Sequence, residues 1–154
     1  MERIMAEREL EELEIIRRIS ASPEAVYKAW TEPELMKQWL APDPNIVIYV
    51  ENDPNPGGLL HIEMKSPDGT QHFIDGKYQK LTPHSFIAKS WKYSGPVDII
   101  QDIETLLEIN FTAVDPGCTD LKLTQSRLKT KEACDAYEAD WPSCLDKLQN
   151  IFLH

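Results

Sequence analysis

The stretch TKEACDAYEADWPSCLDKLQNIFL, residues 130–153, decides how the rest of this chain can fold. Large apolar side chains recur in it at helical spacing, at Trp141, Leu145, Leu148 and Phe152. Thr130 is followed by acidic residues, which is typical of a helix start. Pro142 lacks a backbone donor and should either kink this helix or begin a new one. The sequence therefore predicts a long amphipathic helix with one face that must be buried.

A strand and two short helices are predicted near the start of the chain. LEIIRRI at residues 13–19 is short and rich in β-branched side chains, which favours a strand. In SASPEAVYKAW, Ser22 can cap a helix whose first turn holds Pro23. TEPELMKQWL repeats the same pattern, and the prolines of APDPN end it.

Strand patterns fill the middle of the chain. LLHIEMK alternates, so Leu60, Ile62 and Met64 share one face. SPDGT is typical of a hairpin turn. Gly76 in QHFIDGKYQKL indicates a bulge or a sharp bend, which also decides the faces taken by the residues after it. SFIAKSWKY, TLLEINF and DLKLTQSRL continue the strand pattern.

This order of elements predicts an α+β fold. We expect a curved antiparallel sheet of about six to seven strands around the C-terminal helix, with two short helices after the first strand. Residues 11–154 form a single domain in this interpretation, and residues 1–10 form a flexible charged leader. Because such a sheet rarely closes tightly on one helix, a cavity between them is expected.

Composition narrows the possible partners and the compartment. Sixteen Lys and Arg against 26 Asp and Glu give a formal charge of −10, which disfavours nucleic acid and anionic membranes. No apolar stretch approaches the roughly 18 residues of a membrane span. Cys118, Cys134 and Cys144 are odd in number and lack CxxC spacing, so they predict reduced thiols and no metal site. The expected location is the cytoplasm.

Five segments carry a resemblance to a known family. SPEAVYKAWTEPELMKQWLAP, DPNPGG, SPDGT, GKYQKLTP and DWPSCLDKLQNIF occur in the order seen in homologues of the activator of the heat-shock 90-kDa chaperone ATPase. The resemblance covers roughly residues 11–153 and implies membership of the START-like (SRPBCC) superfamily. It implies a helix-grip fold, with an apolar cavity between sheet and helix where many superfamily members bind lipids, sterols or polyketides.

The chain departs from this resemblance at three positions. Asp140 stands where relatives usually carry a glycine, Tyr137 where a histidine is common, and Leu40 where a second tryptophan often follows the one at Trp39. These departures imply a changed shape and polarity at the cavity mouth. The eukaryotic activators also have a separate N-terminal domain with no counterpart in this sequence, which weakens the chaperone interpretation.

Catalytic motifs give little support to an enzyme. The sequence contains no GxSxG, Walker loop, HExxH or GxGxxG motif that would point to a nucleophile, metal or cofactor. His72 and Asp75 are three residues apart in a strand, which puts them on opposite faces unless a bulge intervenes. A buried acid–base pair at these positions is therefore disfavoured.

The leading hypothesis is non-enzymatic binding of a small apolar molecule between sheet and helix, without a cofactor. The predicted wall residues are Leu60, Ile62, Met64, Tyr78, Trp91, Phe111, Tyr137 and Trp141, with Trp39 at the mouth. Tyr137 could also offer its hydroxyl to the ligand. Trp30 shares a helix face with Val26 and should pack in the core. The same residue types would also suit a filled core without a ligand.

Three other interpretations stay open. The first is a stress-related module that stimulates a heat-shock 90-kDa chaperone ATPase, as the resemblance implies. The second is a cyclase- or hydrolase-like enzyme that uses the same cavity, with His72 and Asp75 as candidate groups. The third is a packed domain without a ligand. Exposed sheet edges would also permit a homodimer.

Overall fold

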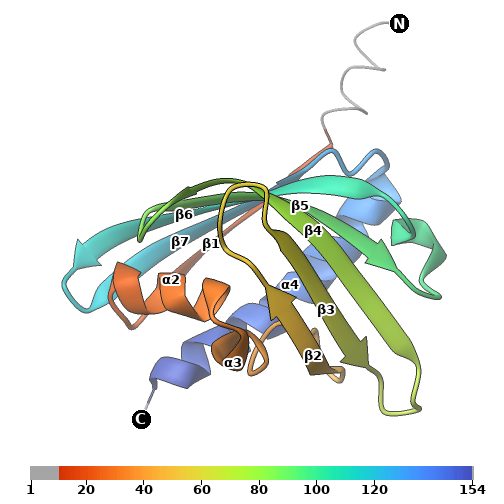
Figure 1. The fold of residues 1–154 in the computed structure, drawn as a ribbon, viewed down its shortest axis with the longest axis horizontal. Coiled ribbons are helices and arrows are strands. Elements are labelled where there is room, and N and C mark those ends of the chain that lie inside the picture. The colour runs from red at the N-terminus through yellow and green to blue at the C-terminus, as the bar shows by residue number, and fades with distance from the viewer. Residues whose placement is uncertain (1–10, 154) are drawn as a thin grey trace, which may run out of the picture.

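The computed structural model describes residues 11–153, which form one curved antiparallel sheet with helices on its concave side (Figure 1). The strand order is β1-β7-β6-β5-β4-β3-β2. The strands are β1 (Leu13–Ile19), β2 (Ile46–Asn52), β3 (Leu59–Lys65), β4 (Gln71–Thr82), β5 (Phe86–Ser94), β6 (Glu104–Asp115) and β7 (Cys118–Ser126). This confirms the predicted α+β architecture. The predicted leader, residues 1–10, lies outside the described residues.

Two short helices follow the first strand and a long helix ends the fold, as predicted. The helices are α2 (Pro23–Thr31), α3 (Pro33–Met36), the 3₁₀ helix η1 (Asp98–Ile100) and α4 (Lys131–Phe152). Ser22 caps α2 by accepting a hydrogen bond at Oγ from the Ala25 backbone at 3.2 Å. Thr130 caps α4 in the same way, with its Oγ1 3.1 Å from the Ala133 backbone nitrogen.

Helix α4 continues through Pro142 as one element, so no new helix begins there. Its buried side chains lie on both sides of the proline, with Tyr137 and Trp141 before it and Leu145 and Leu148 after it. Because both halves bury an apolar face against the same sheet, packing holds them in one helix despite the lost backbone donor.

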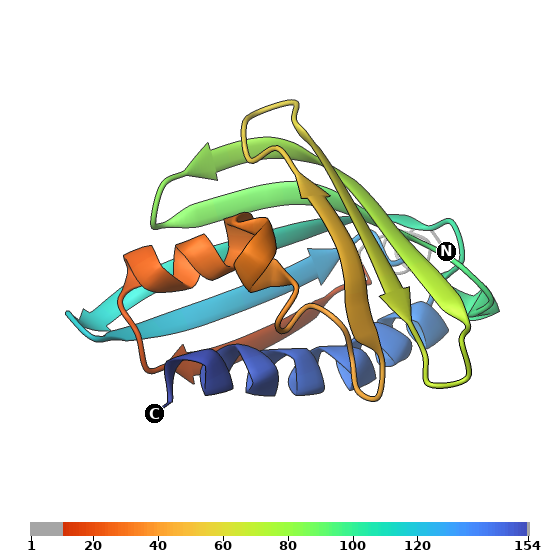
Figure 2. The same cartoon turned by 60° about the horizontal axis from the view of Figure 1, so that its bottom comes forward.

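The sheet curves over α4 in the manner of a grip (Figure 2). Helices α2 and α3 lie on the same concave side and cover its other part (Figures 1 and 2). Beneath them the core is filled: the rings of Trp30 and Trp39 meet edge to face with centroids 4.5 Å apart, and neither side chain is exposed. The region between the first half of α4 and strands β2 to β5 is not filled to the same extent.

Strand β4 bends at Gly76 without a bulge there. The register irregularity between β4 and β5 falls later, between Tyr78 and Lys80. Gly76 instead allows a close approach of two strands, because a Cβ atom at this position would lie 2.2 Å from the backbone oxygen of Ser90. Of the two alternatives raised by the sequence, the bend is therefore the one that the structure contains.

Replacing Gly76 with alanine is expected to lower the free energy of unfolding by about 2 kcal/mol, since the new methyl group would push two paired strands apart. Gly117→Ala is the matched control, because the nearest atom to its added Cβ lies 3.9 Å away. Urea denaturation followed by circular dichroism measures both. Equal stability of the two variants would contradict the close approach at Gly76.

Candidate ligand-binding site

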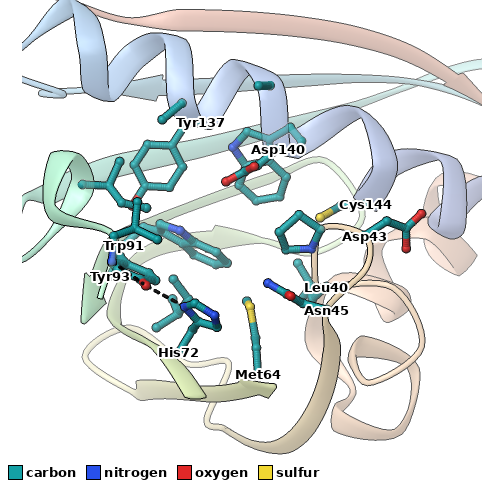
Figure 3. Close-up of a pocket in the computed structure, with 17 residues that line it drawn as sticks. Leu40, Asp43, Asn45, Met64, His72, Trp91, Tyr93, Tyr137, Asp140 and Cys144 are labelled. Atoms are coloured by element: carbon teal, nitrogen blue, oxygen red, sulfur yellow. Dashed lines mark hydrogen bonds between the residues drawn. The ribbon is translucent and has the colours of Figure 1, made fainter. Parts of the chain in front are cut away.

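A cavity of about 330 Å³ lies between the first half of α4 and the strands that face it (Figure 3). The strands contribute Met64, His72, Ile74, Trp91 and Tyr93. Helix α4 contributes Ala136, Tyr137, Ala139, Asp140, Trp141 and Cys144. The remaining sides come from Leu40 and the loop before β2, and from Val97 and Ile100 beside η1. The cavity therefore lies where sheet and helix diverge.

Four of the predicted wall residues line this cavity. They are Met64, Trp91, Tyr137 and Trp141, which come from β3, β5 and α4. The fold brings them together although they are far apart in the sequence, and two of their rings, those of Trp91 and Trp141, lie with centroids 5.4 Å apart.

The other predicted wall residues are buried elsewhere. Leu60, Ile62, Tyr78 and Phe111 point inward from the sheet, as the alternation indicated, but they lie in the packed core and do not line the cavity. Tyr78 donates its hydroxyl hydrogen to Asn52 Oδ1 at 2.7 Å, so its polar end is already satisfied.

Trp39 does not frame the mouth of the cavity, and this expectation is corrected. Its side chain is 0% exposed and its indole nitrogen donates to the Ala29 carbonyl oxygen at 2.9 Å. The chain continues in hydrogen-bonded turns after α3, with Leu40 N bonded to Met36 O, and this turns Trp39 inward against Trp30. Both tryptophans of the short helices therefore pack, and Leu40 rather than Trp39 reaches the cavity.

A buried chain of hydrogen bonds crosses the sheet side of the cavity, and sequence reasoning did not identify it. His72 is 8% exposed; its Nδ1 lies 2.6 Å from Tyr93 Oη and its Nε2 lies 2.8 Å from Ser66 Oγ (Figure 3). Ser66 Oγ donates onward to Asn45 Oδ1 at 2.8 Å. Because that bond uses the only hydroxyl hydrogen of Ser66, His72 must donate from Nε2 and accept from Tyr93 at Nδ1.

This arrangement holds His72 neutral and engages both ring nitrogens. Burial also lowers the pKa of His72, in the same direction. Asp75 points to the opposite side of β4, where its Oδ1 lies 2.7 Å from His61 Nδ1. His72 and Asp75 thus do not form the acid–base pair that the enzymatic alternative would use.

His61 lies on the outer face of the sheet, as its alternation with Leu60 and Ile62 predicted. Its Nε2 is 2.9 Å from Glu63 Oε2, while its Nδ1 is held by Asp75. The hydrogen bond with Asp75 is the main cause that raises the pKa of His61. This partly exposed cluster lies on the other side of the sheet from the cavity and has no part in the site.

Two polar groups of α4 face the cavity without a partner. Tyr137 is 5% exposed, and within residues 11–153 its hydroxyl has no hydrogen-bond partner. Asp140 is half-buried and its carboxyl group forms no ion pair in the described part of the chain. In Figure 3 both side chains extend from α4 toward Trp91 and His72 across the cavity. Burial raises the pKa of both groups, which is the signature of polar atoms deprived of water.

The second carboxylate of the lining, Asp43, is neutralised. Its Oδ1 lies 3.1 Å from Lys147 Nζ, which also donates to the Ala41 carbonyl oxygen. The Asp43 backbone nitrogen donates to Ser143 Oγ at 3.0 Å. These contacts fasten the loop before β2 to α4 and leave Asp140 as the lining carboxylate whose charge is not balanced.

A buried hydrogen-bond relay fixes the two tryptophans of the wall. Trp141 Nε1 donates to Gln125 Oε1 at 2.9 Å, and Gln125 Nε2 donates to Thr105 Oγ1 at 3.0 Å. Thr105 then donates to the Trp91 backbone oxygen at 2.7 Å. The relay joins α4 to three strands, so it holds one wall of the cavity in a defined position.

Lys89 is a further buried group that the sequence analysis did not single out. It is 0% exposed, and among the described residues its ammonium nitrogen has no hydrogen-bond partner. The nitrogen lies 5.2 Å from the ring centre of Tyr78, 5.4 Å from Trp30 and 5.5 Å from Trp91. Burial lowers the pKa of Lys89 to about 7. Lys89 does not line the cavity, and it meets the cavity wall at Trp91.

The three positions at which the sequence departs from its resemblance all reach the cavity. Leu40, Tyr137 and Asp140 are lining residues. This spatial grouping was not visible in the sequence, where Leu40 lies far from the other two. The departures were nevertheless the available signal for Asp140, since no motif marks it.

A curved antiparallel sheet that holds a long C-terminal helix, with two short helices after the first strand, defines the helix-grip fold of START-like proteins. Residues 20–152 match the family described as activator of Hsp90 ATPase homolog 1-like protein. The chain belongs to this family, which confirms the resemblance carried by the five sequence segments.

Solved structures with the same fold come from several bacteria. A protein from Chromobacterium violaceum is 24% identical, with a TM-score of 0.78 over 92% of this chain and 96% of its own. A protein from Rhodobacter sphaeroides is 25% identical, with a TM-score of 0.77 over 91% and 90% of the two chains. The AHSA1 protein from Silicibacter pomeroyi is 20% identical, with a TM-score of 0.80 over 92% and 96%.

No curated protein gave a match to this chain. None of the helices in residues 11–153 has the length and apolar character needed to cross a membrane. No group of three His, Cys, Asp or Glu side chains in that range is arranged to hold a metal ion.

Proposed function

We propose that this protein binds a small, mainly apolar ligand in the cavity between α4 and strands β3 to β5, without chemical conversion. The observation that carries the proposal is the Tyr137 hydroxyl, which lies buried on the wall of an otherwise largely apolar cavity and has no partner in residues 11–153. A buried hydroxyl without a partner costs about 1–3 kcal/mol, and a ligand that hydrogen-bonds to it would remove that cost.

The geometry of the walls supports binding rather than catalysis. Trp91, Trp141 and Met64 offer apolar surface, and the relay through Gln125 keeps the two indole rings in place. A rigid apolar wall with a few polar groups is the common form of a small-molecule site. His72 is fully engaged with Tyr93 and Ser66, so it would have to break two hydrogen bonds before it could accept a proton from a substrate.

The cytoplasm is the proposed location. Cys118, Cys134 and Cys144 are all unpaired, and two of them are buried. Burial raises the pKa of Cys144 to about 12, so this thiol stays protonated and unreactive. Three free thiols of this kind suit a reducing compartment.

Filling the cavity is expected to abolish binding of the apolar fluorescent probe N-phenyl-1-naphthylamine. The wild-type protein should give a saturable rise in probe fluorescence, and Ala136→Phe should weaken the affinity at least about tenfold, because the new ring would occupy the cavity beside Tyr137. Ala113→Phe is the control, since Ala113 is exposed on β6 away from the cavity. An equal affinity of the two variants would contradict binding in this cavity.

Native mass spectrometry of the protein as purified complements this titration. An added mass of small-molecule size, lost on denaturation and lost in Ala136→Phe, would supply the natural ligand for identification. A ligand mass that persists in Ala136→Phe would place binding elsewhere and overturn the proposed site.

A second candidate function follows from the family. The family description names activators of the Hsp90 ATPase, and the outer part of β2 and β3 exposes Ile46, Tyr49 and Leu59, which could contact a protein partner. This function predicts faster ATP turnover by the purified chaperone when the protein is added, and a slower effect with Leu59→Glu. An unchanged turnover rate at saturating protein would exclude it.

A further inference from the structure

We propose that the ligand of this cavity is an organic amine, whose cationic head binds between Asp140 and Tyr137 and whose apolar body lies against the aromatic wall. The inference rests on the proposed function and adds the chemical class of the ligand. It follows from the balance of charge, from the hydrogen-bonding groups and from the rings that surround the cavity.

The balance of charge favours a cation and disfavours a carboxylate. Of the two lining carboxylates, Asp43 is paired with Lys147 at 3.1 Å, whereas Asp140 has no ion-pair partner among residues 11–153. No lysine or arginine belongs to the lining in that part of the chain. A carboxylate ligand would place a second uncompensated negative charge beside Asp140, where partial burial strengthens the repulsion. A cationic head would instead supply the missing partner.

The free hydrogen-bonding capacity of α4 points the same way. Asp140 is an acceptor when ionised, and the Tyr137 oxygen has lone pairs that no described residue uses. An ammonium group carries several N–H donors and can therefore serve both side chains at once. A hydroxyl head carries one donor and can serve only one of them in this way.

Aromatic rings line the space next to these acceptors. Trp91, Trp141, Tyr93 and Tyr137 all belong to the wall, and the first two lie with ring centroids 5.4 Å apart at an interplanar angle of 44°. The face of an indole or phenol ring attracts a cation through its quadrupole. Amine recognition in proteins commonly combines such rings with one carboxylate, and this cavity contains both.

Lys89 does not reverse this balance. Its ammonium group lies over the ring of Trp91 and is not part of the lining. Two further rings, those of Trp30 and Tyr78, share it. Lys89 is thus held in the packed core and does not offer a counter-charge to an anionic ligand inside the cavity.

The test uses three probes with the same apolar body and different heads: 4-phenylbutylamine, 4-phenylbutan-1-ol and 4-phenylbutanoate. Isothermal titration calorimetry at neutral pH should show that the amine binds at least about tenfold more tightly than the alcohol, because its head gains a charge-assisted hydrogen bond. The butanoate should bind more weakly than the alcohol.

Asp140→Asn then isolates the carboxylate. This variant should bind the amine about tenfold more weakly than the wild type does and should bind the alcohol with an affinity changed by less than about twofold. Glu138→Gln is the matched control, because Glu138 is exposed two residues away on α4 and is not a lining residue. It removes the same charge and should leave the affinity for all three probes unchanged.

The outcomes separate the two proposals. Alcohol binding without any preference for the amine would overturn the amine inference and leave the proposed function standing, as would an amine preference that survives in Asp140→Asn or disappears equally in Glu138→Gln. Failure of all three probes to bind the wild-type protein would instead overturn apolar ligand binding itself. The comparison of heads on the wild-type protein does not depend on the folding of any variant.

Discussion

Replacing Lys89 with methionine is expected to raise the free energy of unfolding by about 3 kcal/mol at about pH 6. Methionine has a similar length and keeps the contacts with Trp30, Tyr78 and Trp91, but it removes an amino group that has no hydrogen-bond partner among the described residues. The attraction of the three rings for the ammonium group offsets only part of the cost of its burial.

The gain from this substitution should shrink as the pH rises. The pKa of Lys89 is about 7 in the folded protein and about 10.5 in the unfolded chain. Below about pH 7 both states are protonated, and the folded state bears the full cost of a buried charge. Between these two pKa values the unfolded chain binds more protons, so the wild-type protein gains stability with rising pH while the methionine variant does not gain it from this position.

Urea denaturation of both proteins at about pH 6 and about pH 10 measures this difference. Lys92→Met is the control, because Lys92 lies on the same strand with its side chain on the opposite face and is partly exposed. It should show no comparable change with pH. A Lys89→Met protein that is less stable than the wild type at about pH 6 would mean that the ring contacts outweigh the burial of the charge.

Replacing Gln125 with leucine is expected to lower the free energy of unfolding by about 3 kcal/mol and to loosen the cavity wall. The change leaves the buried indole N–H of Trp141 without its acceptor and deprives Thr105 of the amide that donates to it. Because the relay also reaches the backbone of Trp91, both indole rings of the wall lose a fixed position.

Two measurements separate these effects. Urea denaturation should show the loss of stability, and N-phenyl-1-naphthylamine should bind more weakly under conditions where the variant is still folded. Gln71→Leu, an exposed position on β4, is the control and should change neither. Unaltered probe affinity in a destabilised Gln125→Leu protein would show that the relay supports the fold but not the cavity.

The periodicity of the sequence was sufficient to predict the architecture. Alternation in LLHIEMK correctly turned Leu60, Ile62 and Met64 inward, and helical spacing from Trp141 to Phe152 correctly predicted the long C-terminal helix. These predictions succeed because burial of one face is a local requirement that each strand or helix expresses in its own residues.

The position of the cavity could not be predicted in the same way. Leu60 and Met64 lie on one face of one strand, yet only Met64 lines the cavity, because the packing of other elements decides which part of the sheet is covered. Trp39 has the residue type of a pocket wall, but a turn after α3 directs it into the core. Such outcomes depend on contacts between distant segments, which no single stretch of sequence contains.

The polar groups of the site were hidden for a related reason. His72, Ser66 and Asn45 come from different segments, and their hydrogen bonds form only after β3 and β4 have paired. Lys89 alternates with Ile87 and Trp91 in SFIAKSWKY, so its inward direction was readable, although a lysine at such a position is rarely buried. Its burial depends on three rings from α2, β4 and β5.

The division of the interior into a filled part and a hollow part has a consequence for how this protein can diversify. Trp30, Trp39 and Tyr78 hold the fold together in the filled part, where a change of volume is penalised. Leu40, Tyr137 and Asp140 border the hollow part, where a new side chain meets free space instead of a neighbour. Descendants of this chain can therefore exchange one ligand for another through a few substitutions while keeping the same scaffold.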